Sequence, residues 1–149
     1  MVRVSVSKKI RAPLDVIWDT LADLESWPSL ASQNAKNRVI SHRILSREGN
    51  VIVCDEYEQA GWLKARHRDK YILYPNERLE EEIITGDFAG GIVIQLKAIP
   101  EGTLVEVEAN IFPKRLWLRI LGIFLDGETM LSQFWQDLLN QLANVTEKT

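Results

Sequence analysis

The sequence contains little cysteine and little histidine. Cys54 is its only cysteine, and His42 and His67 are its only histidines. A lone cysteine excludes an internal disulfide and a cysteine-rich zinc cage. A transition-metal site would have to rely on carboxylates, so these residue types predict neither a metal nor a cofactor. Cys54 lies in the strand-like segment VIVCDEY, which is typical of an inert packing residue rather than a nucleophile.

Excess positive charge and a long apolar segment are also lacking. The formal net charge is −3, whereas a nucleic-acid-binding surface requires a basic footprint, so we predict no nucleic-acid partner. The most apolar stretch, LWLRILGIFL at 116–125, is too short to span a bilayer and contains Arg119. The N-terminal MVRVSVSKKI alternates in polarity, unlike a secretion signal. We therefore predict a cytoplasmic location.

No repeat, low-complexity tract or linker divides the chain. Of its 149 residues, 46% are hydrophobic and 26% are charged, which is ordinary for a globular protein. This length suits one hydrophobic core, so we predict a single domain over residues 1–149.

The first thirty residues indicate a strand followed by a helical segment. Val2, Val4 and Val6 alternate with polar residues, as in a half-buried strand. The stretch LDVIWDTLADLESWP then repeats apolar residues at helical spacing, and we expect Pro28 to end this helix. The following SLASQNA is consistent with a second short helical turn.

The middle of the chain contains six strand-like segments, and its end contains a helix. Turn signals at 49–50, 60–61, 75–76, 86–87 and 100–102 separate the segments, which predicts antiparallel hairpins. After Pro113 the period becomes helical, with one apolar face formed by Leu131, Phe134, Trp135, Leu138, Leu142 and Val145. One helix covers seven strands only if the sheet curls around it. We predict an α+β fold with a curved seven-stranded antiparallel sheet wrapped around a long C-terminal helix, and two short helices after strand one.

The stretch after the first strand resembles that of a known superfamily. The positions that carry the likeness are Ile10, Ala12, Pro13, Val16 or Ile17, Trp18, Leu21, Asp23, Trp27 and Pro28. They resemble the START-related helix-grip superfamily (SRPBCC), most closely its polyketide cyclase/dehydrase and lipid-transport branch. The resemblance implies a deep, mostly apolar cavity between sheet and helix that holds lipids, polyketides, isoprenoids or aromatic compounds. It does not transfer a catalytic mechanism.

The strand around His67 carries the candidates for chemistry. Its cations Lys64, Arg66, Arg68 and Lys70 alternate with Leu63, Ala65, His67, Asp69, Tyr71 and Leu73, so the second set is expected to face the concave side. His67, Asp69 and Tyr71 are therefore candidate acid–base residues of a cavity. The alternative interpretation is a hydrogen-bonded cluster without catalysis.

Other acidic and glycine-rich segments leave alternatives open. Asp55 and Tyr57 share one face of their strand and either orient a ligand in the cavity or face water, with Cys54 pointing inward. The three glutamates at 80–82 are interpreted as a solvated face. Gly90 and Gly91 predict a turn or bulge, with Phe88 as a gate of the cavity.

Tryptophan is above its usual share, with five in 149 residues, and aromatic rings of the C-terminal region either pack in the core or line a hollow. The predicted ligand-binding residues are Trp27, Asp55, Tyr57, Leu63, His67, Tyr71, Phe88, Val107, Phe112, Phe124, Leu131, Phe134 and Trp135. The segment 112–125 places cations beside Trp117 and Phe124, which fits either transient membrane contact or a packed helix with solvated cations.

With no visible nucleophile–base or metal constellation, the sequence favours binding or transport of a hydrophobic small molecule. The alternatives are a cyclase or dehydratase that uses His67, Asp69 and Tyr71, and a module that interacts with proteins or ribosomes.

Overall fold

The computed structural model describes residues 2–30, 36–114 and 127–147. The strands are β1 (Val2–Ile10), β2 (Asn37–Glu48), β3 (Val51–Ala60), β4 (Leu63–Tyr74), β5 (Arg78–Gly86), β6 (Phe88–Ile99) and β7 (Gly102–Pro113). The helices are α1 (Leu14–Ala22), a short 3-10 helix η1 (Leu24–Ser26), α2 (Trp27–Leu30) and α4 (Gly127–Thr146). The predicted order of elements is confirmed.

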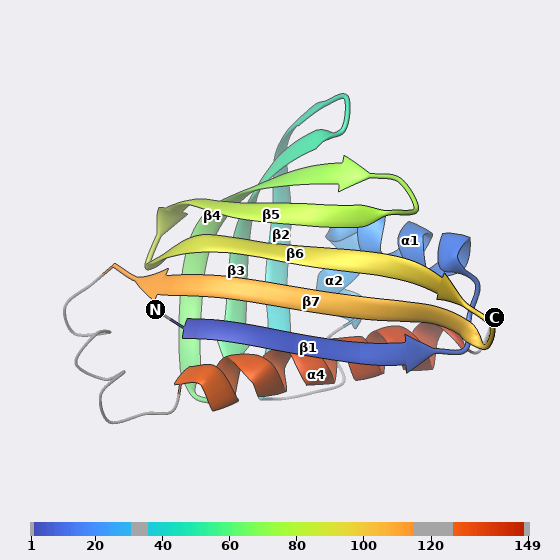
Figure 1. Cartoon of the computed structure of the whole chain (residues 1–149). Coiled ribbons are helices and arrows are strands. Elements are labelled where there is room, and N and C mark those ends of the chain that lie inside the picture. The colour runs from blue at the N-terminus through green and yellow to red at the C-terminus, as the bar shows by residue number, and fades with distance from the viewer. Residues whose placement is uncertain (1, 31–35, 115–126, 148–149) are drawn as a thin grey trace.

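The strands form one antiparallel sheet in the order β1-β7-β6-β5-β4-β3-β2. The long helix α4 contacts β1 at one edge of the sheet and also β2 and β3 at the other edge. One helix reaches both edges only because the sheet curls around it, as Figure 1 shows. The helix-grip architecture with two short helices after the first strand is therefore confirmed.

Pro28 begins a helix instead of ending one. Helix α1 already ends at Ala22, and Pro28 is the second residue of α2. A proline is tolerated in the first turn because the backbone N–H that it lacks has no intrahelical partner there. The expectation that Pro28 stops the first helix is therefore wrong, although the helix pair itself is present.

Gly90 and Gly91 lie inside β6 and not in a turn. Gly90 pairs with Ile111 of β7, and the ladder continues back to Phe88 opposite Pro113. Gly90 has a φ of 122°, and a Cβ atom there would lie 1.9 Å from the carbonyl oxygen of Asn110. Gly90 thus permits a close approach of the backbones of β6 and β7, which a residue with a side chain would prevent.

The buried face of α4 is displaced from the predicted one near its end. Phe134, Trp135, Leu138 and Leu142 are buried as expected, but Val145 is 42% exposed. Leu139, Ala143 and Thr146 are buried in its place. Helix α4 is contacted from two sides by the curled sheet, so its buried stripe is wider than that of a helix lying on a flat sheet.

None of the helices in the described parts of the chain has both the length and the apolar character needed to span a membrane.

Candidate functional site

A cavity of about 130 Å³ lies at the end of the concave face where α4 begins. Most of its lining is apolar, and six of the predicted ligand-binding residues take part: Leu63, His67, Phe88, Leu131, Phe134 and Trp135. Glu58 and His67 are the acidic and basic side chains among the described lining residues. The cavity therefore has apolar walls and one polar corner.

Other predicted ligand-binding residues lie away from this cavity. Trp27 is buried beneath α1, where its Nε1 donates a hydrogen bond of 2.9 Å to the carbonyl oxygen of Leu21. Its ring stacks on His42 with centroids 5.2 Å apart. Val107 is buried in the core of the sheet, and Phe112 is 44% exposed. Phe124, like most of the segment 112–125, lies outside the described residues.

Asp55 and Tyr57 lie on the outer face of β3. Asp55 accepts hydrogen bonds from Arg68, at 2.8 Å, and Arg43, at 3.2 Å. The guanidinium of Arg66 lies 4.1 Å from the centre of the Tyr57 ring. The inward face of β3 instead carries Ile52, Cys54 and Glu56. Of the two interpretations of this strand, the solvated face with Cys54 pointing inward holds, because the side chains alternate and Cys54 is completely buried.

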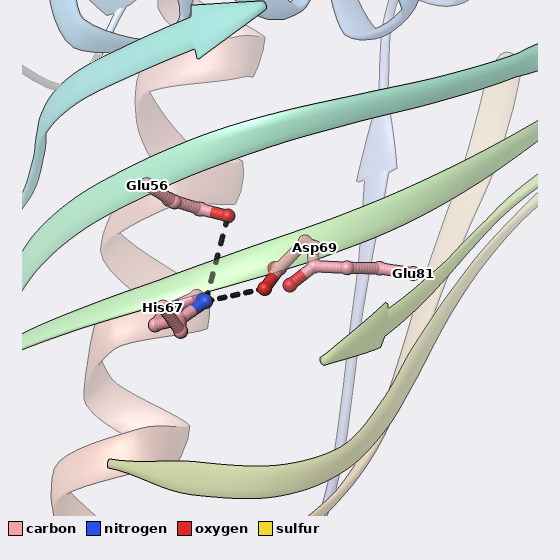
Figure 2. Close-up of side chains that lie close together, drawn as sticks. All are labelled: Glu56, His67, Asp69 and Glu81. Carbon is pink, nitrogen blue, oxygen red and sulfur yellow. Dashed lines mark hydrogen bonds and ion pairs between the residues drawn. The ribbon is translucent and has the colours of Figure 1, made fainter. Parts of the chain in front are cut away.

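His67, Asp69 and Tyr71 share the concave face of β4, as predicted, and all three are buried. Nδ1 of His67 lies 2.5 Å from Oδ1 of Asp69, and Nε2 lies 2.9 Å from Oε1 of Glu58 (Figure 2 shows the first contact). Both ring nitrogens therefore face carboxylates. His67 reaches the cavity on one side and a buried polar cluster on the other.

Glu56 is the centre of a row that crosses three strands. It is paired in register with His42 of β2 and His67 of β4. Oε1 of Glu56 lies 2.7 Å from Nε2 of His42, and Oε2 accepts a hydrogen bond of 2.7 Å from the hydroxyl of Tyr71. Oε2 also lies 3.9 Å from Nδ1 of His67. Each oxygen of this buried carboxylate thus has a fixed partner.

Glu81 is buried, which overturns its interpretation as part of a solvated face. It is 5% exposed and lies opposite Tyr71 in the register of β4 and β5. A signal for this was present in the sequence, because Glu81 alternates with Leu79 and Ile83, and both are core residues. Only its neighbours Glu80 and Glu82 point away from the core.

The charges of this region are set by burial together with mutual contacts. Burial alone would lower the pKa of His67, but the carboxylates of Glu58, Glu56 and Glu81 raise it to about 10. Burial opposes ionisation of Glu56, yet His42 and His67 hold the pKa of this carboxyl well below its usual range. At neutral pH, Glu56 is therefore ionised beside a charged imidazole.

The pKa values of Asp69 and Glu81 are raised, in contrast to that of Glu56. Burial, followed by the charges of Glu81 and Glu56, raises the pKa of Asp69 far above its usual range. Burial and the charge of Glu56 raise the pKa of Glu81 to about 7. Carboxylates this close together repel one another in a dry environment, so the group retains protons that exposed acids would lose.

The fold has close counterparts among solved structures. The ZhuI aromatase/cyclase from Streptomyces sp. R1128 superposes with a TM-score of 0.78 over 98% of this chain and 93% of that one, at 11% identity. A START superfamily protein from Mycobacterium smegmatis superposes with a TM-score of 0.71 over 98% and 97% of the two chains, at 15% identity. This chain has the helix-grip fold of these two proteins. The fold that the sequence resemblance implied is thereby confirmed.

Sequence comparison adds a curated relative. A curated Streptomyces cyaneus protein named "Putative polyketide cyclase" is 35% identical over 102 residues, which are 63% of this chain and 62% of that protein. The matched part of this chain thus spans somewhat less than two thirds of the relative's length. No protein-family model matches the chain.

Proposed function

We propose that the protein binds a hydrophobic small molecule bearing a carbonyl group and catalyses an acid–base reaction on it, of the cyclase or dehydratase type. The observation that carries this proposal is the pair formed by His67 and Glu58, 2.9 Å apart at the polar corner of an apolar cavity. Titratable side chains that converge in a cleft are candidates for acid–base roles. The curated relative named as a polyketide cyclase supports the same reaction class.

Size and lining restrict the part of the substrate that enters. A cavity of about 130 Å³ is close to the volume of about 150 Å³ that accepts a benzene molecule in an engineered protein core. One aromatic ring, or an acyl chain of similar volume, therefore fits among Phe88, Phe134 and Trp135. The substrate carbonyl then lies at the polar corner, where Nε2–H of His67 donates a hydrogen bond to its oxygen.

Glu58 suits the role of the base. Its side chain is 27% exposed, whereas that of His67 is 2% exposed, so a substrate can displace Glu58 from the ring without moving the buried cluster. In the dehydration of a β-hydroxyketone, the Glu58 carboxylate removes a proton from the α-carbon, which lies between the carbonyl carbon and the carbon that bears the hydroxyl group. The electron pair forms the carbon–carbon double bond, and the hydroxyl leaves as water with the proton that Glu58 took.

The test uses the β-hydroxyketone formed by aldol addition of acetone to benzaldehyde, whose dehydration product absorbs in the near ultraviolet. We expect the protein to accelerate its dehydration, and Glu58→Gln or His67→Gln to lower kcat by about a hundredfold or more. Glu48→Gln, an exposed change at the end of β2, is the matched control and keeps the wild-type rate. Thermal melts identify variants that fail to fold.

A carrier function is the second candidate, favoured by the predominance of apolar residues in the lining. Tryptophan fluorescence separates the two, because Trp135 lines the cavity and is quenched by an aromatic ligand. Saturable quenching by the hydroxyketone with no dehydration above buffer contradicts catalysis and supports a carrier. Wild-type rates in both Glu58→Gln and His67→Gln also contradict the catalytic proposal.

A further inference from the structure

Four buried side chains behind the cavity converge on one point. Glu56 comes from β3, His67 and Asp69 from β4, and Glu81 from β5. Each offers one oxygen or nitrogen atom, and these four atoms lie within 4.8 Å of one another. Figure 2 shows the side chains directed toward one another between the strands. We call these residues the four-residue cluster.

Two oxygen atoms of the cluster have no hydrogen-bond donor from outside the cluster among the described residues, so only a proton held between the acids or a cation can satisfy them. They are Oδ2 of Asp69 and Oε1 of Glu81, and these two residues are 0% and 5% exposed. Figure 2 shows the carboxyl groups of Asp69 and Glu81 ending beside each other, next to the ring of His67. Buried carboxyl oxygens without a partner are costly, so a positively charged partner at this point would relieve both.

The donor atoms are those that a divalent transition metal uses. One imidazole nitrogen and three carboxylate oxygens match the ligands of Zn²⁺ and Mn²⁺, whereas Mg²⁺ and Ca²⁺ favour sites built from oxygen alone. Four ligands at zinc distances lie about 3.4 Å apart in a tetrahedron. The separations of Nδ1 of His67 from Asp69, 2.5 Å, and from Glu56, 3.9 Å, fall on either side of that value.

The surroundings of the cluster resemble the outer shell of a metal site. If Nδ1 of His67 is the ligand, its Nε2 donates to the Glu58 carboxylate at 2.9 Å, as metal-bound histidines commonly do. Glu56 is oriented by His42 and by the Tyr71 hydroxyl, both at 2.7 Å. Two of the four ligands are thus held in place by partners outside the cluster.

We propose that the four-residue cluster is a binding site for one divalent transition-metal ion, with Zn²⁺ and Mn²⁺ as the expected occupants. The site lies on the far side of His67 from the cavity and uses Nδ1 of the ring, whereas the acid–base pair proposed above uses Nε2 with Glu58. The two proposals share His67 but are tested by different variants, because Asp69 and Glu81 are not part of the acid–base pair. The competing account is that Asp69 and Glu81 share a proton and bind no metal.

The experiment is a calorimetric titration of the chelator-treated full chain with Zn²⁺ and, separately, with Mn²⁺. The metal content of the protein is then measured after gel filtration. We expect one ion per chain and a higher melting temperature with the ion bound. Substitution by Co²⁺ should give visible absorption bands of a low-symmetry site. Glu81→Gln and Asp69→Asn should each weaken binding at least about tenfold, because each removes a ligand.

Glu82→Gln is the matched control, since this neighbour on β5 is 67% exposed on the opposite face and pairs with Lys70. It should bind the ions as the wild type does. Absence of stoichiometric binding by the folded wild type overturns the proposal in favour of the shared proton. Equal affinity of the wild type and Glu81→Gln places any bound ion elsewhere and also overturns it. Activity toward the hydroxyketone is measured separately on metal-free protein.

Discussion

Replacing Tyr71 by phenylalanine should destabilise the protein by removing one hydroxyl. Tyr71 is completely buried, and its hydroxyl donates to Oε2 of Glu56 at 2.7 Å. A hydrogen bond to a charged group contributes about 1.5–3 kcal/mol to the free energy of unfolding, and its loss leaves the buried carboxylate short of a donor. For a domain of this size that corresponds to a fall in melting temperature of about 3–12 °C.

The assay is urea unfolding followed by fluorescence, with a thermal melt as a second measure. Tyr74→Phe on the same strand is the control, because that ring lies under Arg78 at 3.8 Å, and the change should stay within about 0.5 kcal/mol. A double-mutant cycle with Glu56→Gln should give a coupling free energy of about 1 kcal/mol or more. A change below about 0.5 kcal/mol for Tyr71→Phe, or strict additivity with Glu56→Gln, would refute the assigned contact.

Two further outcomes test the electrostatics and the backbone. The pKa of His67 is about 10 in the folded protein and 6.5 in the unfolded chain, so the contribution of this histidine to the free energy of unfolding is complete below pH 6.5 and is lost as the pH rises toward 10. With chelator present, the free energy of unfolding should fall over this range by up to about 1.4 kcal/mol per pH unit. A His67→Gln variant whose free energy of unfolding falls as steeply would contradict this. Gly90→Ala should lower the free energy of unfolding by more than about 2 kcal/mol, because the new Cβ would lie 1.9 Å from the carbonyl oxygen of Asn110. Gly49→Ala has open space around the new Cβ and should lower it by about 1–2 kcal/mol, the cost of the left-handed backbone alone. Equal losses for the two variants in urea unfolding would contradict the packing argument.

The face of β4 was predictable because its two faces differ in chemistry. Four cations mark the side toward water, so His67, Asp69 and Tyr71 had to point inward. Strand β3 gave no such contrast, since acids alternate on both of its faces, at Asp55 and at Glu56. Its orientation follows from pairing with β4, which is information that a period of two within one strand does not contain.

Two members of the buried polar region were hidden for different physical reasons. Glu81 stands in a row of three glutamates, and local charge suggested solvation although Leu79 and Ile83 on the same face indicated burial. His42 points inward because the register of β2 shifts between Val39 and Ser41. Such a bulge reverses which residues of the strand point inward after it, and no residue type in β2 predicts the bulge. Long-range pairing therefore decides what the local pattern leaves ambiguous.

The first strand of the chain forms an edge of the sheet beside the last strand, and this has a consequence for how the chain reaches its structure. Strands β2 to β6 pair with their sequence neighbours, whereas β1 pairs with β7, so that Val2 lies opposite Ile111. The four-residue cluster is built entirely from the neighbouring strands β3, β4 and β5. Local pairings form at lower loop-closure cost than distant ones. The carboxylates can thus assemble while water still reaches them, and the docking of the two chain ends, β1 and α4, then dries the interior.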